Sequence, residues 1–328
     1  MIDALRNISG RVYFCVILFL LIAPALILSI GQGFYLEMLT RVLILTIAVV
    51  SLNLIVGYGG MISLGHAAYI GIGAYCVGIP SYYEIYNGFI HLGLAIVCSA
   101  AFALVTGAIC LRTRGLYFIL ITLAFTQMLH FTFVSIDEYG ADDGLVIYQR
   151  SEFGGLIDIE NTTTLYYLVL IVLLISLYLM HRLINARFGR VLFGIKHNEE
   201  RMQSLGYDTY KYKLTCYVIS GTLCGVAGFL LANFSNFISP SMMDWIHSGD
   251  LIFMMVIGGT GAVLGPVVGT ATFLFLEEFL SGITVYWHLI FGLLLIALVM
   301  FGKGGLHGFL TCLDSKWPSS SQRSRGGK

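Results

Sequence analysis

The chain has 328 residues, of which 58% are hydrophobic and 11% charged, and its mean hydropathy is +0.87. A soluble domain of this length is far less apolar, so the composition excludes an ordinary water-soluble enzyme or a nucleic-acid-binding protein. The formal net charge of zero hides an asymmetry that appears once membrane spans are assigned. The composition predicts an all-α polytopic membrane protein with the lipid bilayer as its solvent.

The first apolar run, Val12 to Ile30, contains 19 uncharged residues. As a helix it is about 28 Å long, which is enough for one crossing. Arg6 and Arg11 precede it, so it also fits a signal peptide with Ala23-Pro24-Ala25 as a poor cleavage site. Because the apolar run continues beyond that triplet, we expect an uncleaved first span.

Nine later segments are candidate spans by their length and lack of charge. They cover about residues 42–57, 61–80, 89–111, 115–135, 165–181, 213–238, 250–260, 264–281 and 284–302. We therefore expect about ten transmembrane helices, with eight or nine as the alternatives. The segments at 42–57, 250–260 and 264–281 are short or interrupted by glycine, so re-entrant or broken helices can replace some crossings.

The segment from Ser51 to Tyr75 combines glycines with polar residues inside an apolar region. Glycines destabilise an uninterrupted helix and allow close backbone approach, and here they are Gly57, Gly59, Gly60, Gly65, Gly71 and Gly73. Asn53, Ser63 and His66 each need a partner or a water-lined cavity at this depth. The pattern fits a broken helix pair beside a translocation path, and it fits equally well small-residue packing with His66 bonded internally.

A polar stripe marks the span at 115–135. Thr122, Thr126 and His130 lie four residues apart on one helix face, with Gln127 beside them. Such a stripe can line a translocation path, or it can form hydrogen bonds between helices worth about 1 kcal/mol each. Both interpretations stay open. The candidate path residues are Asn53, Ser63, His66, Thr122 and Gln127.

The basic residues predict the orientation. With the N-terminus in the cytoplasm, ten spans place 16 of the 18 Lys and Arg residues inside and leave only Arg41 and Arg150 outside. The positive-inside rule favours this arrangement, in which both termini are cytoplasmic. The loop 135–164 then faces outward and carries seven acidic residues against Arg150 alone, so it can meet another protein.

The predicted cytoplasmic loop 182–212 contains the one long, strongly charged amphipathic segment, Arg187 to Gly206. Its apolar residues are close to helical spacing, and they are Val191, Leu192, Ile195, Met202 and Leu205. Asn198 can cap a short helix with Glu199 and Glu200 in its first turn, and Gly206 can end it. We expect a short helix or helix pair outside the bilayer that is presented to another surface. The alternative is an interfacial helix that contacts only lipid headgroups.

Glycines interrupt the last third of the chain as they do the region around Gly57, since Gly258, Gly259 and Gly265 fall between two short apolar segments. Residues 1–310 are expected to form a single transmembrane domain. The tail at 311–328 is rich in Ser, Arg and Gly from Ser319 onward, and we expect it to be short, cytoplasmic and disordered.

The sequence carries no recognisable pattern of catalysis. The seven cysteines show neither a CxxC pair nor a framework spacing, so neither disulfides nor a metal site is implied. No Gly-x-x-x-x-Gly-Lys-Ser/Thr, His-Glu-x-x-His or Gly-x-Ser-x-Gly motif occurs. We therefore expect no catalytic residue, no cofactor, no metal and no nucleotide site in this chain, which is not expected to be an enzyme.

Five stretches between about residues 50 and 270 follow one family pattern. In the charged loop they are Phe188-Gly189-Arg190, Leu192, Ile195, Asn198-Glu199 and Ser204-Leu205-Gly206. In the spans and outer loop they are Gly57-Tyr58, Gly60, Ser63-Leu64-Gly65-His66, Ala68, Gly71, Gly73-Ala74-Tyr75, Arg114 to Phe118, Thr122 to Phe125, Gly140, Asp143-Gly144-Leu145, Val256 to Gly259, Gly261, Gly265-Pro266-Val267 and Gly269. These stretches resemble the permease subunits of bacterial ATP-binding-cassette (ABC) importers for branched-chain amino acids.

Within the charged loop, Glu200 and Gly206 have the spacing of that family's Glu-Ala-Ala-x-x-x-Gly coupling signature. Arg201 and Met202 replace its two small residues, and Lys196 replaces the usual arginine. The resemblance implies an ATPase-coupling loop that includes Arg187, Gly189, Arg190, Asn198, Glu199, Glu200 and Gly206. It also implies structural roles for Gly57, Gly60, Gly65, Gly258, Gly259 and Gly265.

The resemblance implies a permease that moves leucine, isoleucine and valine across the bacterial inner membrane by alternating access. It implies separate ATP-binding subunits that hold ATP and Mg, a second, similar permease in a heterodimer, and a periplasmic substrate-binding protein. A permease of the same type for urea or short amides is the main alternative. An ion-coupled secondary transporter or a channel is the other, and the former usually needs charged groups deep in the bilayer, where we expect only His66 and His130.

Overall fold

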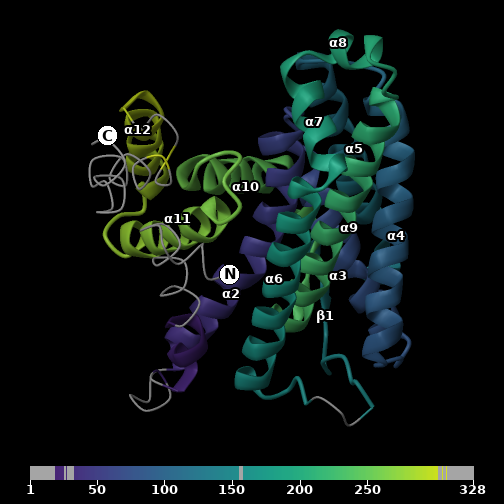
Figure 1. Cartoon of the computed structure of the whole chain (residues 1–328). Coiled ribbons are helices and arrows are strands. Elements are labelled where there is room, and N and C mark those ends of the chain that lie inside the picture. Colours follow the sequence, from purple (N-terminus) through teal and green to yellow (C-terminus); the bar gives the residue numbers. More distant parts are fainter. Residues whose placement is uncertain are drawn as a thin grey trace.

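A computed structural model describes residues 19–25, 27, 33–154, 158–301, 305 and 308, and its elements are labelled as in Figure 1. The longer helices are α2 (Gly33–Asn53), α3 (His66–Tyr82), α4 (Gly88–Cys110), α5 (Leu116–Val134), α6 (Thr162–Asn185), α9 (Thr209–Ser235), α10 (Trp245–Gly258), α11 (Gly265–Ser281) and α12 (Trp287–Phe301). The shorter elements are the π-helical turn η2 (Leu54–Tyr58), the helices α7 (Arg187–His197) and α8 (Glu199–Ser204), the 3-10 turns η3 (Asp137–Tyr139), η4 (Ala141–Asp143) and η5 (Pro240–Met243), and the strands β1 (Leu145–Val146) and β2 (Phe237–Ile238). The predicted helical character is confirmed, with one two-stranded ribbon added.

Five helices of the described part are long and apolar enough to cross a membrane, namely Gly33–Tyr58, α4, α5, α6 and α9. Two more apolar helices, α10 and the Trp287–Ala297 part of α12, are shorter. The count of about ten crossings and the cytoplasmic placement of both termini stay predictions. Most of the expected first span and all of the tail at 311–328 lie outside the described residues.

One predicted boundary is wrong. The span expected at 42–57 begins at Gly33, so Arg41, which was expected in an external loop, lies inside α2. Its guanidinium is half exposed and lies 3.9 Å from the carboxylate of Glu277 in α11. A span predicted from hydropathy ends at such a charge. A helix, in contrast, can contain the charge when the side chain has a partner or contacts water.

Helix α9 occupies the centre of the bundle and packs against α2, α3 and α4. Where α3 and α9 cross, their backbones touch through glycines. A Cβ atom on Gly73 would collide with the carbonyl oxygen of Gly225, and one on Gly228 would collide with that of Ile70. Membrane helices gain little from burying apolar side chains away from lipid, so close backbone packing of this kind holds them together.

The predicted glycine interruptions are confirmed as breaks between helices. Residues 59–65 join η2 to α3, and residues 259–264 join α10 to α11, without helical structure in either connection. The two breaks lie together, because a Cβ atom on Gly57 would be 2.8 Å from the backbone nitrogen of Gly261. Gly60 and Gly259 have φ values of +68° and +105°, which residues with a side chain rarely adopt.

The loop after α5 lies at the end of the bundle opposite α7 and α8 (Figure 1). It runs from the end of α5 at Val134 to the start of α6 at Thr162, close to the predicted limits of 135–164. Its strand β1 pairs antiparallel with β2, and Glu152 forms a parallel bridge with Asn87. The Arg150 side chain donates to Asn236 Oδ1 at 3.1 Å. The loop is therefore tied to the ends of α4 and α9.

Replacement of Gly73 by alanine is expected to destabilise the bundle by about 1–3 kcal/mol, because the added methyl group forces α3 and α9 apart. Gly93 in α4 is the matched control, since a Cβ atom there meets nothing within 4 Å. Thermal unfolding in detergent should show a lower midpoint for G73A and an unchanged or higher midpoint for G93A. Equal midpoints for both variants would contradict the glycine contact.

Candidate coupling surface and translocation path

The segment after α6 folds into the two short helices α7 and α8 at one end of the bundle (Figure 1). Helix α7 buries Gly189, Val191, Leu192 and Ile195 against the bundle. The predicted helix pair is confirmed, but Leu205 was expected on its apolar face and is 65% exposed. Leu205 follows the end of α8, where the chain turns, so the helical spacing no longer decides which way it points.

Local capping defines α8. Asn198 lies between the two helices in an extended conformation, and its Oδ1 accepts a hydrogen bond from the backbone N–H of Arg201 at 2.9 Å. Glu199 and Glu200 follow in the first turn, where the helix dipole favours negative charge. Gly206 follows the helix at φ +87°. These are the features that the sequence predicts for this helix.

Lys196 ties α7 to the first helix break. Its Nζ donates to the carbonyl oxygen of Gly57 at 2.6 Å, and Gly57 belongs to the turn in which α2 ends. The stem of Lys196 passes over Gly60, where a Cβ atom would lie 2.9 Å from Lys196 Cγ. An ammonium group makes a strong, charge-assisted hydrogen bond to such an oxygen. A displacement of α7 therefore acts directly on the break.

Glu199 forms the second tie. Its carboxylate accepts a hydrogen bond from Lys213 at the start of α9, and it lies 3.5 Å from the guanidinium of Arg114 after α4. Burial alone would raise the pKa of the Glu199 carboxyl. The hydrogen bond and charge of Lys213, together with the charge of Arg114, outweigh burial and hold this pKa below its ordinary value. Glu199 thus joins α8 to α9 and to the turn between α4 and α5.

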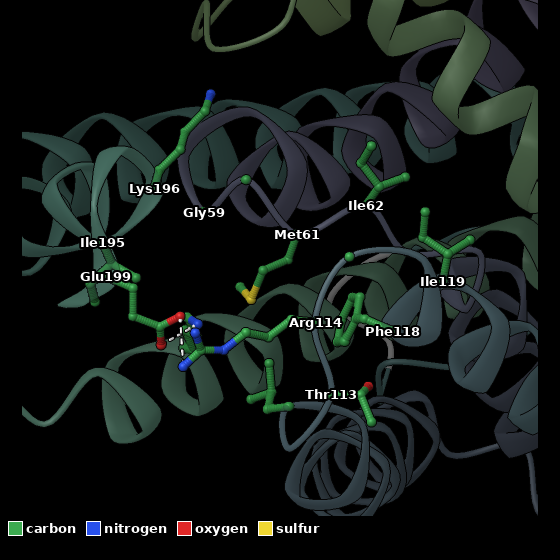
Figure 2. Close-up of a pocket in the computed structure, with 14 residues that line it drawn as sticks. Gly59, Met61, Ile62, Thr113, Arg114, Phe118, Ile119, Ile195, Lys196 and Glu199 are labelled. Carbon is green, nitrogen blue, oxygen red and sulfur yellow. Dashed lines mark hydrogen bonds and ion pairs between the residues drawn. The ribbon is translucent and has the colours of Figure 1, made fainter.

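A pocket with a volume of about 240 Å³ lies between these ties and the bundle (Figure 2). Its walls come from the first break at 59–62, from the turn at 111–119, and from Ile195, Lys196, Glu199 and Lys213. In Figure 2, Arg114 and Glu199 point toward each other, and Met61 of the break points toward this pair. The pocket is therefore lined both by the glycine-rich segment that follows α2 and by the charged segment of α7 and α8.

The predicted coupling residues divide into two groups. Arg187, Arg190, Glu200 and Gly206 are exposed. The other three hold the helices in place: Gly189 packs on the Ile184 backbone, Asn198 caps α8, and Glu199 is bonded inward. Phe193 and Leu205 add apolar area to the exposed surface, with 52% and 65% of each residue accessible. We call this exposed set the coupling surface.

Asn53, a candidate path residue, joins the two helix breaks. Its side-chain amide donates to the carbonyl oxygen of Ala262 at 2.8 Å, and its Oδ1 accepts from the backbone N–H of Gly261 at 3.0 Å. Ser63 acts within the first break, where its Oγ accepts from the backbone N–H of Gly65 at 3.1 Å. Both residues are buried. In this conformation their polar atoms serve unpaired backbone groups of the breaks.

His66 begins α3 and is fully buried. Its Nε2 lies 3.0 Å from Ser220 Oγ of α9, and that hydroxyl donates to the carbonyl oxygen of Ser51 in α2. The imidazole Nε2 therefore donates to Ser220, while Nδ1 has no hydrogen-bonding partner. His66 thus connects three helices at the centre of the bundle.

The polar stripe on α5 divides along its length. Thr122 Oγ1 accepts from the backbone N–H of Leu64 at 3.2 Å, and Thr126 Oγ1 donates to the carbonyl oxygen of Leu64 at 3.2 Å. These two buried threonines therefore bond α5 to the first break. Gln127 and His130 are only partly buried and bond to the segment between β2 and α10 instead. A role in lining the path stays a prediction for all five candidates.

Sequence reasoning missed three residues of this arrangement. Lys213 and Arg114 had no assigned role, because the positive-inside rule uses only their side of the membrane and not their partner Glu199. Asp244 fell in the gap between two predicted spans, yet it accepts a hydrogen bond from Gln127 Nε2 at 3.1 Å. Its neighbours on the chain, Met243 and Trp245, are apolar, and hydropathy carries no signal for such a contact.

A bundle of apolar helices with two adjoining breaks, and a helix pair anchored at one end, is the architecture of a multi-pass membrane protein. A family model described as the branched-chain amino acid transport system / permease component matches residues 34–299. The chain belongs to this family, which comprises permease subunits of ABC transporters and not enzymes.

Individual relatives are similar at moderate identity. The high-affinity branched-chain amino acid transport system permease protein LivM of Salmonella typhimurium is 25% identical over 323 residues, which cover 92% of this chain and 75% of that protein. Two probable branched-chain amino acid transport permease proteins of Methanocaldococcus jannaschii are also similar. The LivM of Methanocaldococcus jannaschii is 24% identical over 78% of this chain and 88% of its own length. The LivH of the same organism is 31% identical over 43% of this chain and 46% of its own length. No solved structure matches the chain.

A double-mutant cycle tests the tie between α8 and α9. Glu199→Gln and Lys213→Gln should each lower the free energy of unfolding by about 2 kcal/mol, because each leaves a largely buried charge without its partner. The double variant should lose less than the sum of the two. Lys211 and Asp208 provide the matched control, since both are highly exposed and their pair is worth less than about 1 kcal/mol.

We also expect the Glu199 carboxyl to make the stability of the protein depend on pH. Its pKa is lower in the folded protein than in the unfolded chain, where it is about 4.3. The stabilisation is therefore fully present above that value and is lost as the pH falls through the folded pKa. Thermal unfolding between neutral and acid pH should show a smaller acid loss for E199Q than for the unchanged protein, and equal losses would contradict the tie.

Proposed function

We propose that this chain is the membrane-spanning subunit of an ATP-driven importer for leucine, isoleucine and valine in the inner membrane of a bacterium. Two ATP-binding subunits that hold ATP and Mg dock on the cytoplasmic side, and a periplasmic substrate-binding protein delivers the amino acid from outside. The translocation path lies between this chain and a second, similar permease. The similarity to both LivM and LivH of a single organism supports a pair of related but different permeases.

The coupling surface is the observation that carries this proposal. A surface outside the apolar bundle with exposed Phe193 and Leu205 among the charged Arg190 and Glu200 fits a protein partner better than solvent alone. It is firmly attached to the bundle through Lys196 and Glu199. A docking surface that must transmit force needs both properties, whereas a helix that rests on lipid headgroups does not need such an attachment to the bundle.

The contacts also supply a route for the movement. Lys196 holds the carbonyl of Gly57, and Asn53 one turn earlier holds the backbone of the second break at Gly261 and Ala262. Closure of the ATPase dimer shifts α7 and α8 together, and the shift reaches both breaks through these bonds. The breaks act as hinges that change the access of the central path from outside to inside. No covalent chemistry is required of this chain.

Branched-chain amino acids are the substrates that fit best. The relatives named above are described as branched-chain amino acid permeases, and the polar residues buried in the otherwise apolar bundle, such as Asn53, His66 and Ser220, include no Lys, Arg, Asp or Glu among those that the structure describes. A small zwitterion with an apolar side chain suits such a path. Urea or a short amide is the alternative substrate for the same machinery. An ion-coupled carrier or a channel would not need the coupling surface.

Purification of the tagged chain from its native membrane tests the proposal. Mass spectrometry should identify an ATP-binding subunit and a second permease in stoichiometric amounts. The reconstituted complex should take up leucine only with ATP and the liganded binding protein. Uptake of urea in place of leucine would correct the substrate. Uptake by the chain alone, without ATP, would replace the importer with a carrier or channel.

A charge placed on the coupling surface should release the ATP-binding subunits. Leu205→Glu is expected to reduce their copurification and ATP-driven uptake by at least about tenfold, because it introduces a desolvated charge at the interface. Val146→Glu, at a 54% exposed position in the loop at the opposite end, is the matched control for copurification. Normal copurification of the L205E variant would contradict the assigned surface.

A further inference from the structure

The chain between α9 and α10 returns into the bundle instead of staying at its end. Strand β2 pairs with β1 in the loop after α5, but Met243, five residues further on, is fully buried. A Cβ atom on Gly71 in α3 would collide with the Met243 side chain. Ser248 Oγ then accepts a hydrogen bond from the backbone N–H of Ala67 at 2.9 Å, in the first turn of α3. Residues 243–248 therefore run alongside the first half of α3.

This return places a carboxylate at the level of the membrane-spanning helices. Asp244 follows Met243 directly, and its Oδ1 accepts a hydrogen bond from Gln127 Nε2 at 3.1 Å. Gln127 lies well inside α5, which is one of the helices long and apolar enough to cross the bilayer. Asp244 and Gln127 are both partly exposed. Among the residues that the structure describes, no Lys, Arg or His forms an ion pair with Asp244.

A carboxylate in this position cannot face lipid, because a charge in the hydrocarbon region needs a counter-charge, a hydrogen-bonding partner or water. One amide satisfies only part of the hydrogen-bonding capacity of a carboxylate. The exposed side of Asp244 therefore faces either a water-filled path or another protein. Of these two alternatives, we adopt the water-filled path.

The surface beside the carboxylate is apolar. Leu120, Ala124, Met128 and Phe131 follow helical spacing on α5 next to Gln127, and all four are exposed. Trp245, adjacent to Asp244, is 44% exposed. A cation-binding carboxylate next to apolar side chains matches the two ends of an aliphatic amino acid, with its ammonium group and its hydrocarbon side chain.

We propose that Asp244, oriented by Gln127, binds the ammonium group of the amino acid as it passes along the central path. The proposal rests on the importer function proposed above. Asp244 accepts hydrogen bonds from the ammonium group, and the adjoining face of α5 contacts the aliphatic side chain. The site holds its substrate only briefly. A single carboxylate beside an apolar surface attracts the amino acid, but it binds the amino acid weakly enough to release it.

The test compares Asp244→Asn with Asp244→Glu in the complete importer, reconstituted in liposomes with its binding protein and with leucine as the probe. The D244N variant should lower leucine uptake by at least about tenfold, the usual effect of losing a hydrogen bond to a charged group. ATPase activity stimulated by the liganded binding protein should stay within about twofold, because neither docking surface is altered. The D244E variant keeps the charge and should transport faster than D244N.

Glu278→Gln, at an exposed carboxylate of α11, is the control and should leave uptake unchanged. Wild-type uptake in the D244N variant would overturn the proposal. Loss of the second permease or of stimulated ATPase activity along with uptake would also overturn it, and would make Asp244 a contact between subunits. If the unaltered complex shows no ATP-dependent uptake, the importer function fails and the proposal falls with it. If the unaltered complex and the D244N variant both take up leucine normally, the importer function stands and only the role proposed for Asp244 is wrong.

Discussion

The fold depends on one constraint, which is that every backbone N–H and C=O group inside a bilayer needs a partner within the protein. Continuous helices meet it by themselves, but the two breaks at 59–65 and 259–264 do not. The backbone N–H groups of Gly59, Met61 and Gly259 bond to carbonyls of the preceding helices, and side chains pair several of the other groups. Asn53 serves Gly261 and Ala262, and Thr122 and Thr126 both serve Leu64. The buried polar residues of this chain are therefore mainly what makes its interrupted helices tolerable in lipid.

The same constraint explains why the coupling end is attached where it is. The carbonyl oxygen of Gly57 lies at the turn in which α2 ends, and the partner that it finds is Lys196 of α7. A helix pair at the end of the bundle thereby completes the pairing of a turn among the apolar helices. If α7 moves, the oxygen loses a strong bond or the break moves with it. The pairing of one carbonyl thus makes the break sensitive to events at the coupling surface.

Local signals in the sequence predicted the coupling helices well. Asn198, Glu199 and Gly206 define the cap, first turn and end of α8 through contacts within a few residues, and the structure confirms them. The glycine breaks were also predicted, since glycine acts on its own backbone. The partners across the fold were not. Asn53 meets Ala262 across 209 positions, and no periodicity records such a distance.

The segment between α9 and α10 lies between two predicted spans, and its burial could not be predicted for a related reason. Its residues from Ser239 to Asp244 include a proline, serines and an acid, which is the composition of an exposed loop. Its burial depends on a complementary shape, because Gly71 leaves room for the Met243 side chain. Hydropathy averages over a window and cannot detect a fit between two particular residues. Charge at membrane depth is thus easily missed when it enters on a short return of the chain.

The packing also indicates which parts are free to move. Helices α3 and α9 meet backbone to backbone at Gly73 and Gly228. Sliding one of these helices past the other would therefore cause collisions. Helix α5 buries only Phe118, Thr122 and Thr126, and two of these hold it to the first break through Leu64. A movement of that break therefore carries α5 along its rigid neighbours. Helix α5 also bears Gln127, whose side chain bonds to Asp244, so this helix is held both to the first break and to the segment before α10.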